Sequence, residues 1–140
     1  VLAQFSICYN IACALVNGRV GLSDFTTEAF LRPDVLSVAT RVTPIVDEEI
    51  ERRFGRNVTP ARVEAVIDGK VYSAQVEEAK GGAESPMSEQ DKRRKVEDCL
   101  TFAGFDAGRA SFFEEVVGAL ENSADVAADI KRLISGVIKR

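Results

Sequence analysis

A polar stripe on an otherwise apolar helix is the first feature of this sequence that could carry chemistry. On a helical wheel, four side chains of the stretch QFSICYNIACALVNGRV fall within about 60° of one another: Ser6, Asn10, Cys13 and Asn17. Tyr9 lies beside this stripe. A Tyr on a buried helix needs a partner for its hydroxyl, so Tyr9 is either satisfied inside the core or directed into a cleft. The residues alone favour the core.

The composition limits what the chain can catalyse by itself. Its 140 residues contain no histidine, the side chain that most often transfers protons near neutral pH and most often binds zinc. The three cysteines, Cys8, Cys13 and Cys99, are odd in number and lack metal-site spacing, which predicts buried thiols in a reducing cytoplasm and no metal site. These features weigh against a self-contained active site.

Charge patterns argue against several kinds of partner. The net charge of -4 speaks against nucleic-acid binding, which needs a surface rich in Lys and Arg. The basic run from Lys92 to Lys95 and carboxylate pairs such as Glu114-Glu115 are better explained as solvated surface, although the basic run could bind phosphates or carboxylates. The apolar N-terminal stretch is interrupted by Asn10 and too short to span a bilayer. We therefore expect a core helix of a truncated chain and no membrane association.

A small antiparallel sheet is the clearest element that the sequence predicts. The alternating stretches ARVEAVID and GKVYSAQVE form a hairpin over about 61–78 if Asp68-Gly69 is a two-residue turn. In that register Val63 faces Ala74, and one face of the hairpin is apolar, which predicts a half-buried sheet covered by helices. A short strand near 41–46 should join the sheet at an edge.

Helical periodicity accounts for most of the remaining chain. Apolar residues surround the stretch from Phe5 to about Arg19, which is typical of an interior helix. Further helices are expected on both sides of Pro33 and at 47–54, 88–103, 112–120 and 126–137. The fold class is therefore α+β, with an α+β domain over 1–87 and a helical segment over 88–140.

Several linked segments resemble the MmgE/PrpD family. The family phrase of QFS, a Tyr three residues later, A-x-A-L and G-R-V is similar to QFSICYNIACALVNGRVGLSDFT. The resemblance continues in order through RVTPIVDEEIERRF, PARVEAVIDGKVYSAQV and KGGAESPMSEQDKRRKVEDC, and so covers Gln4 to about Leu100.

The resemblance implies an enzyme of small di- and tricarboxylates, as in 2-methylcitrate dehydratase, cis-aconitate decarboxylase and iminodisuccinate epimerase. Members pair a large helical domain with an α+β lid and transfer a proton next to a carboxylate, without a required metal. Their catalytic histidines lie in segments upstream of QFS, which agrees with the absence of histidine here. We therefore expect the C-terminal, lid-bearing part of a cytoplasmic lyase or isomerase that needs no cofactor, inactive on its own.

The resemblance also implies roles for particular residues. Tyr9 matches the motif tyrosine of the family, whose hydroxyl would face the cleft and bind or protonate the substrate. Gln4 and Ser6 would line the same edge. Lys80-Gly81 matches a family loop that would bind substrate, or have a structural role.

Two alternatives to a catalytic part remain open at this point. The chain could be a non-catalytic α+β interaction module, or a relic that retains the fold without the chemistry. In the family-based interpretation the last two predicted helices would pack on a missing domain. The isolated chain should then expose apolar surface and form a homodimer or otherwise self-associate.

Overall fold

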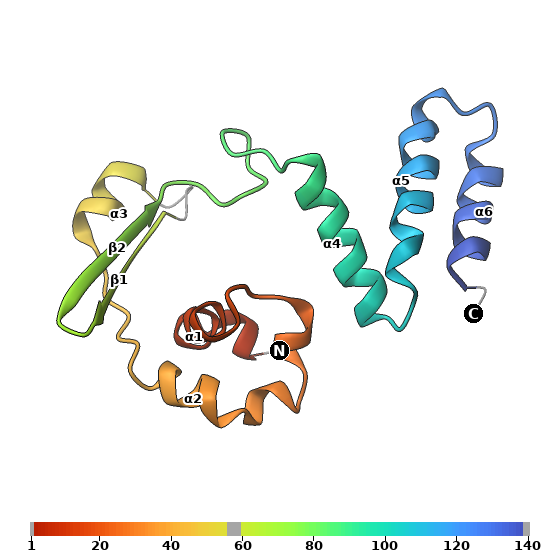
Figure 1. Ribbon diagram of the computed structural model, residues 1–140. Coiled ribbons are helices and arrows are strands. Elements are labelled where there is room, and N and C mark those ends of the chain that lie inside the picture. Colours follow the sequence, from red (N-terminus) through yellow and green to blue (C-terminus); the bar gives the residue numbers. More distant parts are fainter. Residues whose placement is uncertain (1, 56–59, 139–140) are drawn as a thin grey trace. The chain divides into compact units, whose positions relative to one another are not determined.

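The computed structural model describes residues 2–55 and 60–138, with side chains from Ala3 to Gly136 within these ranges. The chain forms two compact units (Figure 1). The first unit joins the N-terminal segment up to Thr43 with the segment from Glu89 onward, and the second spans Pro44–Ser88. The division of an intact protein into domains at 1–87 and 88–140 stays a prediction.

The N-terminal part of the first unit is built around α1 (Ile7–Asn17), which follows the 3-10 turn η1 (Leu2–Phe5). The Ser6 side chain caps the start of α1 by accepting from the Tyr9 N–H at 3.2 Å. Gly18 ends the helix with φ of 72°, a left-handed conformation that glycine adopts without steric cost.

One face of α1 packs against α2 (Pro33–Ala39) and forms the core. Tyr9, Ala12 and Cys13 are buried there together with Val35 of α2. Two 3-10 turns, η2 (Leu22–Phe25) and η3 (Ala29–Leu31), connect the helices where the sequence predicts a helix before Pro33.

The prediction of an interior helix from Phe5 to Arg19 is only partly correct. Phe5 is 80% exposed and Ile7 60% exposed in this chain, so α1 is buried along one face. The apolar residues on the other face have no covering element among the described residues.

The second unit consists of α3 (Glu48–Phe54) and a hairpin of β1 (Ala61–Ile67) and β2 (Lys70–Val76). The predicted register is confirmed, since Val63 pairs with Ala74. Asp68 with φ of 51° and Gly69 with φ of 76° form the turn, and left-handed conformations at both positions define a type I′ hairpin.

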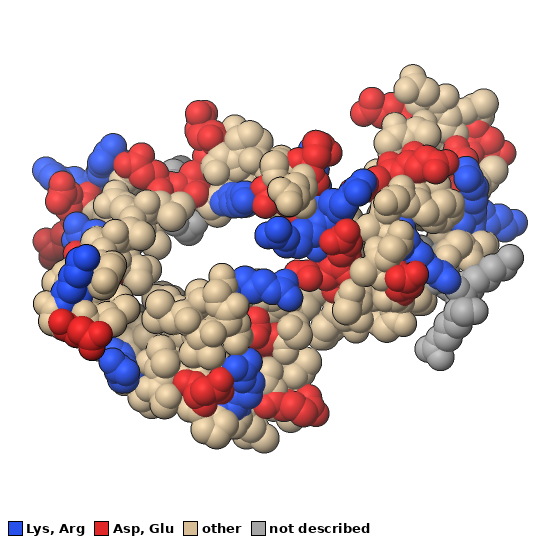
Figure 2. Space-filling model, in the orientation of Figure 1, with Lys and Arg blue, Asp and Glu red and all other residues tan. Residues whose placement is uncertain are grey.

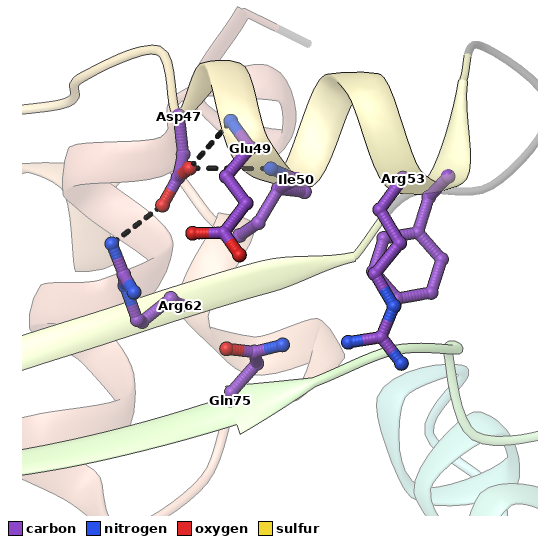
Figure 3. A pocket seen from close by; sticks show the side chains of 7 residues that line it. Asp47, Glu49, Ile50, Arg53, Arg62 and Gln75 are labelled. Atoms are coloured by element: carbon purple, nitrogen blue, oxygen red, sulfur yellow. Dashed lines mark hydrogen bonds and ion pairs between the residues drawn. The ribbon is translucent and has the colours of Figure 1, made fainter.

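Two predictions about the sheet are wrong. Residues 42–47 form no strand, and the described sheet contains β1 and β2 alone. Pro44 removes one backbone donor there, and a short segment needs a neighbouring strand that local sequence cannot supply. Within the described part of the second unit, the apolar face also lacks the expected helical cover, because α3 lies against the opposite, polar face of Arg62 and Gln75 (Figure 3). Tyr72 is accordingly 50% exposed.

The C-terminal part of the first unit contains helices whose positions agree with the predicted ones. These are α4 (Glu89–Phe102), η4 (Ala107–Arg109), α5 (Ala110–Ala119), η5 (Leu120–Asn122) and α6 (Val126–Ile138). Leu100, Ala110, Val116 and Leu133 are their buried apolar residues. Among the described residues, no helix combines the length and apolar character that a membrane span requires.

The contact between α5 and α6 depends on a glycine (Figure 1). A Cβ atom at Gly136 would lie 2.5 Å from Cε1 of Phe112, whose ring also carries the Arg132 guanidinium 5.4 Å from its centroid. Gly136→Ala should therefore lower the unfolding free energy by about 1 kcal/mol, because overpacking outweighs the helix propensity of Ala.

Gly118 of α5 provides the matched control for this substitution. No atom lies within 4 Å of a Cβ added there, so Gly118→Ala should stabilise the helix, by about 0.5 kcal/mol. Thermal unfolding of both variants measures the difference. Equal shifts of the unfolding temperature in the same direction would contradict the close approach at Gly136.

Candidate functional site

Tyr9, the predicted catalytic residue, lies in the core of the first unit. Its side chain is 5% exposed, and its hydroxyl donates to the backbone carbonyl oxygen of Asp24 at 2.7 Å. Its ring packs edge-on against Phe30, at 5.3 Å between centroids, and against Phe25 at 6.2 Å. The hydroxyl is thus satisfied inside the protein, which is the alternative that the residues alone favour.

A polar network extends from Tyr9 through the segment that connects α1 and α2. The Asp24 side chain, in a residue only 8% exposed, accepts from Asn17 Nδ2 and from the Gly21 N–H, both at 2.8 Å. Asn17 Oδ1 in turn accepts from Arg32 Nη1 at 3.1 Å. We call Tyr9, Asn17, Asp24 and Arg32 the Asp24 network. It fixes the η2 turn against α1, because each buried polar group in it has a partner.

The electrostatics of this network keep Tyr9 protonated. Burial, followed by a hydrogen bond with the Cys13 side chain, raises the pKa of Tyr9 to about 12. Burial also raises the pKa of the Cys13 thiol. At the surface end, the Arg32 guanidinium lowers the pKa of Asp34, whose Oδ2 lies 2.6 Å from Arg32 Nη2. Tyr9 can therefore serve as a hydrogen-bond donor near neutral pH, and it is a poor base.

The raised pKa makes stability depend on pH in the alkaline range. The folded-state pKa of about 12 lies above the ordinary value of 10.0, so the folded chain holds this proton more tightly than the unfolded chain. The stabilisation is complete below about pH 10 and is lost as the pH rises towards about 12. Urea unfolding between pH 8 and 11.5 should show this loss, and Tyr9→Phe should remove Tyr9's share of it. An unchanged alkaline slope in Tyr9→Phe would contradict the assignment.

The remaining polar residues of the stripe satisfy backbone groups at the start of α1. Asn10 Nδ2 donates to the Gln4 carbonyl oxygen at 3.0 Å and to the Ser6 carbonyl oxygen at 2.9 Å. Ser6 is the helix cap, and the Gln4 side chain is exposed. The structure thus brings Gln4, Ser6 and Tyr9 to one end of α1. Their roles in substrate binding and catalysis stay predictions.

Lys80 and Gly81 belong to the other compact unit, in the loop after β2. Gly81 has φ of 103° and donates its N–H to the Ser85 carbonyl oxygen at 2.6 Å. The Glu78 carboxylate accepts from the Glu84 N–H at 3.0 Å and tightens the same loop. The left-handed backbone at Gly81 is a structural reason for glycine. A substrate-binding role for Lys80 and Gly81 stays a prediction.

A small polar pocket that the sequence did not indicate lies between α3 and the hairpin (Figure 3). Its volume is about 100 Å³, and it is lined by Asp47, Glu49, Ile50, Arg53, Phe54, Arg62 and Gln75. One Asp47 oxygen caps α3, and the other lies 2.6 Å from Arg62 Nη2. The sequence features that could have indicated it are Asp47 before a short helix and Arg62 on the polar face of the strand. Because Asp47 and Arg62 pair with each other, the main role of the pocket residues is to hold α3 against the hairpin.

The charged residues elsewhere also pair with one another. In the basic run of α4, Lys92 lies 2.7 Å from Glu89, and Arg93 lies 2.5 Å from Glu114 of α5. Basic and acidic side chains are interspersed over much of the visible surface (Figure 2). Among the described residues, no group of three or more His, Cys, Asp or Glu side chains is placed to hold a metal ion.

Fold and site together define an α+β protein whose most buried polar groups serve to position its own segments. Residues 1–122 match the family model of the MmgE/PrpD C-terminal domain, so this chain belongs to the MmgE/PrpD family. The match continues beyond Leu100, where the recognisable sequence segments end, through α5 to the end of η5. No curated protein and no solved structure gives a significant match to the chain.

Proposed function

We propose that this chain is the lid-bearing C-terminal part of an MmgE/PrpD-type enzyme that acts on small di- or tricarboxylates. The reaction is a dehydration, decarboxylation or epimerisation that transfers a proton next to a carboxylate, as in a lyase or isomerase. The observation that carries the proposal is the family match over residues 1–122 in a chain that contains no histidine. Histidine is the side chain that most often transfers protons near neutral pH, so its absence supports the proposal that the main acid and base come from another segment.

The proposed division of labour makes the isolated chain inactive. The chain would contribute the lid and returning helices, and a homodimer in the cytoplasm without a cofactor is the expected context. A panel of small polycarboxylates should give no turnover with these 140 residues, and turnover once the preceding coding segment is joined to them. Turnover by the isolated chain would contradict the proposal, and so would a joined protein that folds and remains inactive on every member of the panel.

Two roles are proposed for Tyr9, that of a catalytic proton donor and that of a positioning residue. As a catalytic donor, its hydroxyl would have to exchange the Asp24 carbonyl for a substrate oxygen. As a positioning residue, it would hold the η2 turn through the hydrogen bond of 2.7 Å. The packed ring and the satisfied hydroxyl favour the positioning role in this chain, whereas the family motif favours the catalytic one.

Tyr9→Phe in the complete enzyme separates these roles, because it removes the hydroxyl and retains the ring. Loss of a catalytic donor should lower kcat per folded molecule by about 100-fold or more with little change in KM. Loss of a positioning group should instead lower the unfolding free energy by about 1 kcal/mol with kcat within a few-fold. Circular dichroism measures the folded fraction for both comparisons.

A non-catalytic interaction module is the second candidate, and a specific observation favours it. The exposed apolar residues of α6 include Ile134 at 52% and Val126 at 49% exposure, which form a surface suited to another helix. In the enzyme this surface would meet the large helical domain. A module or a relic would bind a partner there without any carboxylate turnover by the joined protein.

A further inference from the structure

We propose that β1 pairs antiparallel with β1 of a second copy of this chain, about a twofold axis at Val63. Among the described residues, β1 pairs with β2 and with no other strand. The edge of a strand carries N–H and C=O groups that can template the pairing of a further strand. The proposal concerns the second unit alone and does not depend on the proposed enzymatic reaction.

The hairpin register determines which residues of β1 present their backbone groups to the second copy. Ile67 and Lys70 flank the two-residue turn and form a hydrogen-bonded pair. Such pairs alternate along the hairpin, so every second residue of β1 directs its N–H and C=O away from β2. The outward residues are Arg62, Glu64 and Val66. No backbone hydrogen bond joins them to another described segment.

Charge selects one antiparallel register for this edge. With the axis at Val63, Arg62 of each copy faces Glu64 of the other copy, and opposite charges at facing positions stabilise a sheet. With the axis at Arg62 or at Glu64, like charges face each other, which destabilises the pairing. Arg62 and Glu64, two positions apart on an edge strand, therefore make a pattern that is complementary to itself.

The two side chains are available and already oriented. The Glu64 side chain is 60% exposed, and Arg62 Nε of the same chain lies 3.9 Å from its Oε1, beyond hydrogen-bond distance. The Arg62 side chain is 43% exposed, and Asp47 holds its Nη2 at 2.6 Å beside the strand (Figure 3). Arg62 thus loses little side-chain freedom on pairing, which lowers the entropic cost.

Pairing would also extend the two-stranded sheet and cover part of its exposed apolar face. A sheet of two strands is marginally stable in water, and the pairing gives a continuous strand order β2-β1-β1-β2. A twofold axis perpendicular to the sheet keeps the two apolar faces on the same side. Val63 is 37% exposed in the single chain and would contact Val63 of the second copy across the axis.

Cross-linking at the axis tests the register directly in the full 140-residue chain, with Cys99 replaced by Ser because it is exposed. In the proposed register the Cα atoms of the two Val63 residues lie about 4.5 Å apart, within disulfide range. Val63→Cys should therefore form a covalent dimer with diamide in high yield. Ala65→Cys, on the same face, is the matched control, because its two copies lie about 13–14 Å apart along the strands. Equal cross-linking of both variants, or no cross-linking of the Val63→Cys variant, would overturn the proposal.

Charge reversal tests the same register without a covalent bond. Glu64→Lys and Arg62→Glu should each weaken dimerisation in sedimentation equilibrium by about tenfold or more, and the combined exchange should restore it to within about threefold. Glu48→Lys, the same charge change at an exposed residue of α3, should have little effect. If Arg62→Glu prevents folding, Glu64→Lys and the cross-link still show whether the proposed register is correct. Association that Glu64→Lys leaves unchanged would belong to another surface, such as α6, and would overturn the proposal.

Discussion

Replacing Tyr9 by Ala is expected to lower the unfolding free energy of the first unit by about 3–5 kcal/mol, the range for a buried aromatic residue. The ring is 5% exposed and packs on Phe25 and Phe30, and the hydroxyl satisfies the Asp24 carbonyl. The substitution removes both contributions and leaves a cavity in the core that α1 and α2 share. A loss of this size is a large fraction of the stability of a small domain.

Tyr72, the other tyrosine of the chain, is the matched control. It is 50% exposed on β2, so Tyr72→Ala should change the stability of the first unit by less than about 0.5 kcal/mol. Hydrogen exchange of the α1 amides measures the first unit separately from the hairpin. Equal protection of α1 in both variants would show that Tyr9 does not hold this core together.

Asp24→Asn is expected to have the second largest effect, a loss of about 2–3 kcal/mol. The carboxylate accepts from the Asn17 amide and the Gly21 N–H, each on a different oxygen. An Asn side chain has one acceptor oxygen, so its NH₂ group would face one of these donors and leave a buried group unpaired. The η2 turn should then detach from α1.

Asp34→Asn tests whether this effect is specific to the buried carboxylate. Asp34 pairs with Arg32 at the surface, where its side chain is 53% exposed and water screens the pair, so Asp34→Asn should lower the stability much less than Asp24→Asn. Urea unfolding followed by circular dichroism compares the two variants. A loss for Asp34→Asn as large as that for Asp24→Asn would contradict the claim that the buried end of the network carries its stability.

The elements that the sequence predicted correctly depend on local chemistry. The hairpin follows from period-two alternation on both sides of Asp68-Gly69, a pair suited to left-handed turn positions. The strand near 41–46 failed because a strand exists only where a neighbouring strand accepts it, and local sequence does not specify that neighbour. The position of α3 was also unpredictable, since it depends on the ion pair of Asp47 and Arg62, fifteen positions apart.

In the candidate site, too, the local features could be predicted from the sequence and the contacts between distant residues could not. The helical wheel correctly grouped the polar residues of α1, because their spacing is a local property. It did not reveal that Asn17 would reach Asp24 or that Asn10 would bond the Gln4 carbonyl, since both contacts depend on how the chain turns outside the helix. The catalytic interpretation of Tyr9 came from the family motif, and only the intact enzyme can test it.

Deuterium incorporation into small polycarboxylates, followed by proton NMR in D₂O, tests the central claim most directly. The claim is that this chain supplies part of a proton-transfer enzyme whose acid and base come from a preceding segment. The isolated chain should leave every C–H bond next to a carboxylate unexchanged, and the protein joined to that segment should exchange or convert at least one substrate. Exchange by the isolated chain, or neither exchange nor conversion by a folded joined protein, would contradict the account.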